Sequence, residues 1–185
     1  MGEYYDSSSS LNSIAGARAV ISASGSTPTA EFDAFAIDYP AGAEDISSGT
    51  VLSAFLGPNG SITSGSDNAL ATSVILINGT LDLAPGTYSF SVGSDDGFEL
   101  SFGGSVISSF DANRAFNTTT QSVTIEAGDN QDFELLFWEN LGFTGLLFEI
   151  DGNVVDQSIA AVPLPAGLPL LLAGIGGIAL FRRRT

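Results

Sequence analysis

The stretch TYSFSVGSDDGFELSFG, residues 87–103, decides the fold class of this chain. Apolar side chains alternate with small polar ones on both sides of its centre, GSDDG at residues 93–97. The alternating apolar residues are Tyr88, Phe90, Val92, Phe98, Leu100 and Phe102. A period of two is typical of β-strands, so the pattern predicts a hairpin in which two strands flank a tight acidic loop.

The acidic pair at the centre of this stretch has two interpretations. Asp95 and Asp96 lie between glycines, and carboxylate oxygens held together in this way can converge on a hard cation such as calcium. Alternatively, the pair belongs to an ordinary acidic turn, in which one aspartate accepts hydrogen bonds from backbone N–H groups. The sequence leaves both open.

Composition argues against catalysis. The chain has 185 residues, enough for one domain with a sizeable core, and it contains neither cysteine nor histidine. It therefore lacks thiol chemistry, the commonest general base and the usual zinc ligand. Glycoside hydrolysis requires two carboxyl groups about 5 to 9.5 Å apart across a cleft, which adjacent aspartates do not provide. We expect no enzyme.

The charge distribution narrows the range of partners. All 21 acidic residues precede Pro163, where only Arg18 and Arg114 oppose them, so that part of the chain has a net charge of −19. Such a domain repels phosphate backbones, which excludes nucleic acid as a partner. The charge is compatible with divalent cations, and it also serves solubility outside the cell.

Outward from the acidic pair, the chain reads as many short strands. Strands are expected over residues 19–24, 32–39, 74–77, 106–110, 122–126, 133–138 and 145–150, with turns at 78–79, 103–104 and 151–152, and a second hairpin through 128–130. Residues 50–56 are either a short helix or a strand, and residues 57–68 are expected to form a surface loop. With no amphipathic helix in the pattern, these elements predict an all-β fold, an antiparallel β-sandwich with a phenylalanine-rich core.

The C-terminal end has a different composition. Residues 162–166 read VPLPA, residues 167–181 carry no charge, and three arginines precede Thr185. An apolar run of about 20 residues spans a bilayer as a helix, and a cluster of arginines keeps its end of the helix in the cytoplasm. The pattern predicts a short transmembrane helix.

This tripartite end resembles the VPLPA variant of the PEP-CTERM sorting signal. The residues that carry the resemblance are Val162, Pro163, Leu164, Pro165, Ala166, Arg182, Arg183 and Arg184. It implies export from a Gram-negative bacterium, processing by an exosortase-type enzyme, and delivery to the cell surface or extracellular matrix. The first residues have neither a basic region nor an apolar segment of a signal peptide, so we expect the given start either to be truncated or to be placed too far downstream. The resulting division is a β-sandwich domain (1–157), a Pro-rich linker with the sorting motif (158–167), a transmembrane helix (168–181) and a basic cytoplasmic tail (182–185).

Most of the remaining chain is similar to the protective-antigen-type β-sandwich domain, a fold of jelly-roll type. The similarity rests on PGTYSF at 85–90, SDDG at 94–97, the paired glycines at 103–104, Val106 with Ile107, and GEYY at 2–5. Flocculin and adhesin relatives bind sugars through calcium. In calcium-binding members a cis peptide joins the acidic pair, and an asparagine on a later loop completes the site.

Carried onto this chain, the resemblance implies the metal ligands Asp95, Asp96 and Asn140, with the carbonyls of Gly142 and Thr144. The spacing in ENLGFTG, residues 139–145, differs slightly from the flocculin pattern, and Glu139 could also serve. Trp138 either stacks on a bound sugar or belongs to the core.

The sequence thus favours an exported, calcium-dependent carbohydrate-binding module. Its expected partners are an exosortase, an extracellular polysaccharide and, through the C-terminal helix, the inner membrane. The alternative is a structural matrix protein that keeps the sandwich without a working ligand site.

Overall fold

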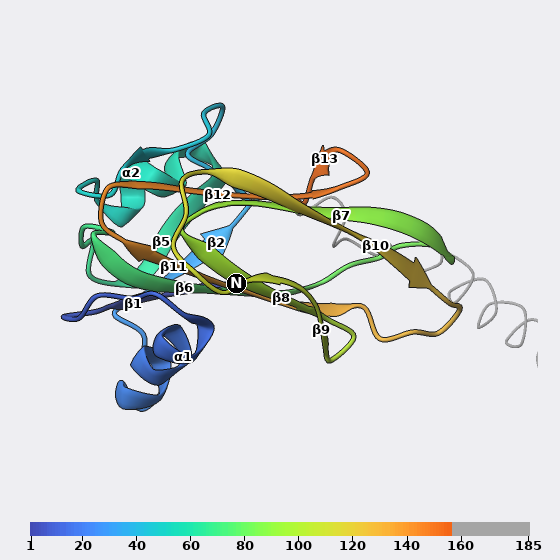
Figure 1. Ribbon diagram of the computed structural model, residues 1–185, viewed down its shortest axis with the longest axis horizontal. Coiled ribbons are helices and arrows are strands. Elements are labelled where there is room, and N and C mark those ends of the chain that lie inside the picture. Colours follow the sequence, from blue (N-terminus) through green and yellow to red (C-terminus); the bar gives the residue numbers. More distant parts are fainter. Residues whose placement is uncertain (157–185) are drawn as a thin grey trace, which may run out of the picture.

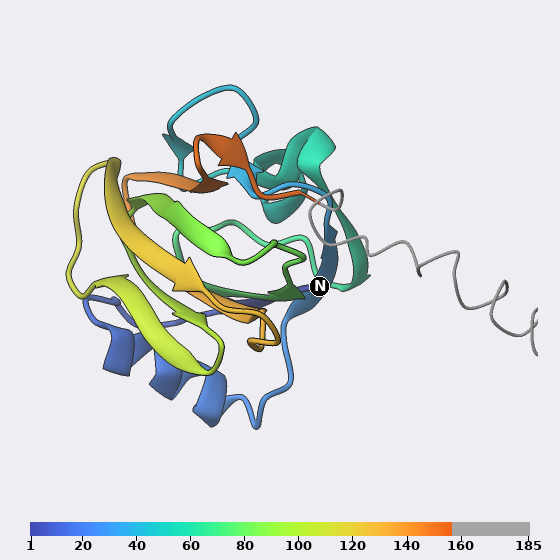
Figure 2. The same ribbon diagram turned by 90° about the vertical axis from the view of Figure 1, so that its right-hand side faces the viewer.

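The computed structural model describes residues 1–156, which form two antiparallel sheets packed face to face (Figures 1 and 2). The first sheet has the order β5-β2-β1-β6-β11-β8-β9, and the second has the order β10-β7-β12-β13, with β3 and β4 also pairing with β12. The expected all-β sandwich is confirmed. The strands of the first sheet are β1 (Gly2–Asp6), β2 (Ala30–Ala34), β5 (Gly60–Gly65), β6 (Thr72–Thr80), β8 (Gly97–Phe102), β9 (Ser105–Phe110) and β11 (Asp132–Asn140). Those of the second are β3 (Asp38–Tyr39), β4 (Ile46–Ser47), β7 (Gly86–Asp95), β10 (Asn117–Ile125), β12 (Phe143–Ile150) and β13 (Asn153–Val154).

The main core lies between the two sheets and is rich in phenylalanine. Phe90 on β7 is buried, and its ring centroid lies 5.3 Å from that of Phe102 on β8 and 5.9 Å from that of Phe148 on β12. These are distances at which aromatic rings attract one another. The alternation of residues 87–103 arises because β7 and β8 each direct every second side chain into this space.

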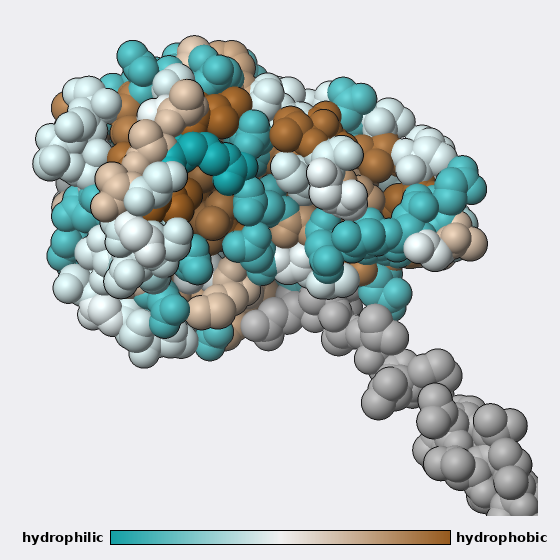
Figure 3. Space-filling model, turned by 90° about the horizontal axis from the view of Figure 1, so that it is seen from below, coloured by the Kyte–Doolittle hydropathy of each residue, from teal (hydrophilic) through white to brown (hydrophobic). Residues whose placement is uncertain are grey.

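A second apolar cluster lies on the outer face of the first sheet, beneath the helix α1 (Ile14–Ala23) (Figure 1). Ser13 begins the helix, since its hydroxyl accepts the N–H of Gly16 at 3.2 Å. Residues 19–24 were predicted to be a strand, and this was wrong. Their β-branched side chains Val20 and Ile21 pack instead against the sheet from a helix, so tertiary burial overrides local propensity. Viewed from the side of α1, polar residues cover much of the surface and apolar ones lie in hollows between them (Figure 3).

The hairpin predicted around Asp95 and Asp96 is also wrong. Strand β7 pairs with β10 and β12, whereas β8 pairs with β9 and β11, so residues 95–97 cross from one sheet to the other. Residues 128–130 likewise connect β10 in one sheet to β11 in the other. Alternation shows which side chains face the core, but strands in opposite sheets share that core, so it does not identify the partner strand.

Smaller expectations had mixed outcomes. The turn at 103–104 is confirmed, with φ of +59° and +81° at its glycines, and so is the turn at 151–152. Residues 50–56 contain a short helix, α2 (Leu52–Leu56), followed by a 3-10 turn (Gly57–Asn59). The loop expected at 57–68 contains β5, and the turn expected at Asn78 and Gly79 lies within β6. Gly79 is required there for packing, since a Cβ would lie 2.6 Å from the Phe133 ring.

The C-terminal predictions lie outside the described residues. These are the Pro-rich linker, the VPLPA motif at 162–166, the helix at 168–181 and the arginines at 182–184. Within residues 1–156, no helix has the length and apolar character that crossing a membrane requires.

Candidate metal site

Two connections between the sheets meet at one end of the sandwich. Residues 95–97 join β7 to β8, and residues 141–142 join β11 to β12 (Figure 1, left). The register places Asp95 opposite Gly145 and Gly97 opposite Trp138, so the two crossings lie side by side. The neighbouring acidic residue Glu139, near the end of β11, therefore reaches the aspartate pair.

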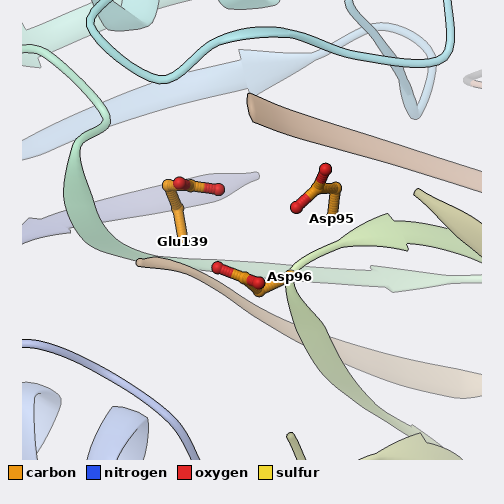
Figure 4. A group of neighbouring side chains, drawn as sticks. All are labelled: Asp95, Asp96 and Glu139. Carbon is orange, nitrogen blue, oxygen red and sulfur yellow. The ribbon is translucent and has the colours of Figure 1, made fainter. Parts of the chain in front are cut away.

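Three carboxylates converge at this point. Asp95, Asp96 and Glu139 point toward a common space (Figure 4), and one oxygen of each lies within 4.8 Å of the others. All three are buried: Asp95 is 7% exposed, Asp96 6% and Glu139 0%. Carboxylates this close repel one another in a poorly solvated space unless a cation or protons separate them.

Part of this cluster lacks hydrogen-bond partners. Among the described residues, neither carboxylate oxygen of Glu139 has a partner, and the same holds for the hydroxyl of Thr144, which is 0% exposed. An unsatisfied buried carboxylate costs considerable folding free energy. A cation among the oxygens, or a proton on the carboxylate, relieves this cost.

The pKa shifts also show that burial disfavours the charged forms of these three carboxyl groups. Burial raises the pKa of Glu139 to about 9, and the charges of Asp96 and Asp95 add to the rise. The hydroxyls of Thr144 and Ser48 oppose this rise, although neither bonds the carboxylate with good geometry in the described part of the chain.

The aspartates are shifted in the same direction. Burial raises the pKa of Asp95 to about 6, helped by Asp96 and Asp45 and opposed by a backbone hydrogen bond from Phe116 and by Arg114. Burial also raises the pKa of Asp96, against the backbone N–H groups that it accepts. Taken together, the shifts describe a site in which negative charge is uncompensated by the protein alone.

Arg114 supports the loop that carries the aspartates. Its guanidinium donates to the Ser94 carbonyl at 3.2 Å and to the Ser94 hydroxyl at 2.8 Å, and it lies over the ring of Phe110 at 4.3 Å. The Ser94 hydroxyl in turn donates to the Asp96 carbonyl at 2.7 Å. A third donor, Nη1, bonds the Thr119 hydroxyl on β10 at 3.0 Å, so the guanidinium connects the Ser94 backbone to the neighbouring strand.

Comparisons with known proteins identify the domain. The chain is similar to the crystal structure of the PA14 domain of the antifreeze protein MpAFP, with 32% identity and a TM-score of 0.72, over 88% of this chain and 91% of that one. The chain belongs to the PA14 domain family. It is also similar to a PA14 sugar-binding domain from an RTX adhesin, with 25% identity, a TM-score of 0.70, and coverage of 85% and 89%. No family profile matches the chain, and no curated protein does. The expected resemblance to the protective-antigen-type sandwich is thereby confirmed.

The residues that the resemblance assigns to the metal site make different contacts in this PA14 domain. The peptide bond between Asp95 and Asp96 is cis, as the resemblance implied. Asn140 donates its backbone N–H to Asp96 at 2.8 Å, while its side-chain oxygen accepts the N–H of Leu11 at 2.8 Å. The carbonyl of Gly142 accepts the Ser48 N–H at 3.0 Å.

Trp138 belongs to the core of this PA14 domain. It is 0% exposed, packs in the cluster beneath α1, and donates its indole N–H to Asn113 at 3.2 Å. A ring buried in this way is not free to stack on a sugar. The core interpretation is therefore the correct one of the two left open by the sequence.

Glu139 is the member of the cluster that the sequence analysis kept only as an alternative. Every second side chain of β11 faces the main core: Phe133, Leu135 and Phe137. Glu139 is the next residue in this alternation. An acidic residue at a core-facing position, near the end of an apolar strand, is a signal that could have identified it.

Proposed function

We propose that this PA14 domain holds a calcium ion among Asp95, Asp96 and Glu139 and uses it to bind a carbohydrate outside the cell. The observation that carries the proposal is the buried Glu139 carboxylate, which has no hydrogen-bond partner among the described residues and faces two further carboxylates. Support for the ligand class comes from the RTX adhesin relative, whose PA14 domain is described as sugar-binding.

The donor set fits a hard cation. Three carboxylates supply charged oxygen ligands, and the hydroxyl of Thr144 and the carbonyl of Gly142 lie on the adjoining segment. Calcium takes about six to eight oxygen ligands in flexible geometry. The oxygens that the protein supplies do not fill all of these positions, so neutral oxygens from a bound ligand can occupy the rest. Vicinal hydroxyl groups of a sugar are such oxygens.

Binding, rather than catalysis, suits this arrangement. The carboxylates are adjacent and buried, whereas glycoside hydrolysis needs two of them facing each other across an open cleft. A calcium ion attracts the hydroxyl groups of a sugar through its charge. The role of Asp95, Asp96 and Glu139 is to hold that ion.

The test is a calcium titration of the full chain in mild detergent, followed by glycan-array binding with and without chelator. The wild type is expected to bind one calcium ion and to bind glycans only when calcium is present. Asp95→Asn with Asp96→Asn should abolish both. A matched control, Asp33→Asn with Asp82→Asn, removes the same charge at two exposed positions and should leave both unchanged. Calcium-independent glycan binding, or no calcium binding, would contradict the proposal, and the absence of any ligand would favour a structural matrix protein.

We further propose that the C-terminal segment is a transient membrane anchor that an exosortase-type enzyme processes near residues 162–166. The sequence supports this through the uncharged run after the Pro-rich box and the arginines that end it. The chain should be expressed behind a signal peptide in cells with and without that enzyme, and its mass and location measured. Removal of the C-terminus, dependent on the enzyme, is expected on surface-located protein. An intact C-terminus on such protein would contradict the processing.

A further inference from the structure

A closed ring of hydrogen bonds surrounds Asp96. One carboxylate oxygen of Asp96 accepts the backbone N–H of Arg114 at 3.0 Å, and the other accepts the backbone N–H of Asn140 at 2.8 Å. The residue before Arg114, Asn113, donates its side-chain amide to the Leu11 carbonyl at 3.0 Å. The Leu11 N–H donates to the side-chain oxygen of Asn140 at 2.8 Å, which closes the ring.

The partners in this ring determine the orientation of both asparagine side chains. The Asn113 amide lies between the indole N–H of Trp138, which is a donor, and the Leu11 carbonyl, which is an acceptor. Its oxygen must therefore face Trp138 and its nitrogen must face Leu11. The end of Asn140 that faces the Leu11 N–H must likewise be its oxygen. Both backbone groups of Leu11, which is 3% exposed, are thus held by asparagines.

The ring has a consequence for Asp96. Each carboxylate oxygen has two lone pairs. A single backbone N–H on each oxygen restrains the carboxylate plane and leaves a lone pair on each oxygen free. The positions of those two N–H groups depend on where residues 113–114 and 140 lie. Their positions depend in turn on the Leu11 peptide, which connects the two segments.

We propose that Asn113 and Asn140 are positioning residues for the metal site: through Leu11 they hold the two backbone N–H groups that orient Asp96. This inference rests on the proposed calcium site. It departs from the role that the resemblance implied for Asn140, because its side-chain oxygen is used by Leu11 rather than directed at the ion. Partners that orient a metal ligand typically contribute about 10- to 100-fold in affinity.

The first test is Asn113→Asp, with calcium affinity measured by calorimetry on the full chain in mild detergent. The substitution keeps an acceptor for Trp138 but places a carboxylate oxygen against the Leu11 carbonyl. It also adds a negative charge to the neighbourhood of the site, which by electrostatics alone would tighten calcium binding. Positioning predicts the opposite, a loss of affinity of about 10-fold or more.

The matched control is Asn153→Asp on β13. There the side-chain amide donates to the carbonyl of Asp151 at 3.2 Å, so the same donor is lost and the same charge is gained outside the ring. Calcium affinity should not fall in this variant. A purely structural role for Asn113 predicts a lower melting temperature in chelator with an unchanged calcium affinity, and that result would overturn the inference, as would tighter binding.

A second measurement needs no variant. Hydrogen exchange at the Leu11 amide of the wild type should slow when calcium is added, because binding stabilises the ring. Faster exchange would show that the Asn140 oxygen leaves Leu11 in the loaded state, and it would also overturn the inference. If the wild type binds no calcium, the proposed function fails and this inference with it. If it binds calcium and Asn113→Asp binds equally well, only the inference fails.

Discussion

Gly97 allows the chain to cross between the sheets directly against an aromatic ring. It lies opposite Trp138 in the ladder of β8 and β11, and a Cβ at this position would overlap the indole. The buried Trp138 indole therefore packs directly against the segment 95–97 that crosses between the sheets. The glycine after the aspartate pair, predicted as part of a turn, is required for close packing.

Gly97→Ala should destabilise the fold by about 1–3 kcal/mol, because the added methyl group forces the indole or the backbone to move. Chemical denaturation in chelator measures this directly. Gly49→Ala is the matched control, since the nearest neighbour of its Cβ would be the Ser47 hydroxyl at 3.7 Å. Equal stability of the two variants would contradict the proposed contact.

The pKa of Glu139 makes a pH dependence expected for the ion-free protein. Its pKa is raised from an ordinary value of 4.5 to about 9, so between these values the folded state binds more protons than the unfolded state. This contribution to stability is fully present below the lower value and is lost as pH rises toward the higher one.

Between about pH 7 and pH 9, Asp95 with its pKa of about 6 is largely ionised, and Glu139 dominates. The free energy of unfolding in chelator should fall by up to about 1.4 kcal/mol per pH unit in this window. Glu139→Gln should remove the slope, because the neutral amide does not titrate. A flat profile for the wild type between pH 7 and pH 9 would contradict the burial argument.

At the scale of elements, strands were easier to predict from the sequence than their partners. The alternation in residues 87–103 correctly identifies β7 and β8, but both face one core from opposite sheets, so pairing them as a hairpin is wrong. Asp95 and Asp96 are predictable because they are adjacent in sequence. Glu139 joins them only because two crossings meet, and no local pattern contains that information.

Helix α1 was missed for a related reason. Its residues Val20 and Ile21 favour strands, and the face that it covers belongs to β6 and β11, whose apolar runs already looked like ordinary core strands. Strands buried on both faces read as continuous apolar runs, as residues 74–77 and 135–138 do. Such a run in an antiparallel sandwich indicates a covering element, here α1.

Arg18 fastens that helix to the sheet. One guanidinium nitrogen lies 2.6 Å from Glu99 on β8 and 2.7 Å from Glu134 on β11, with the arginine side chain 40% exposed. Arg18→Gln should cost about 1 kcal/mol or less at low salt, since exposed pairs are screened. The cost measured by chemical denaturation should shrink at high salt, and a salt-independent cost would contradict an electrostatic role.

At the scale of the whole molecule, stability and ligand binding depend on different residues. Phe90 lies between the sheets in contact with Phe102 and Phe148, so Phe90→Ala should cost about 3–5 kcal/mol. Asp95→Asn should leave the ion-free fold as stable as the wild type or more so, because burial disfavours the charge of Asp95 and the amide oxygen can still accept the backbone N–H of Phe116. Denaturant midpoints in chelator measure both effects. If the Asn variant unfolds while Phe90→Ala does not, this division is wrong.

The most direct test of the account is the melting temperature of the full chain in mild detergent at pH 8, in chelator and at increasing calcium concentrations, for the wild type and Glu139→Gln. An ion that binds only the folded state adds about 2.7 kcal/mol when its concentration is 100 times the dissociation constant. The account predicts that the wild type melts at a lower temperature than Glu139→Gln in chelator and gains stability steadily with calcium, whereas the variant responds weakly. A wild type that melts at the same temperature in chelator and in millimolar calcium would contradict the account.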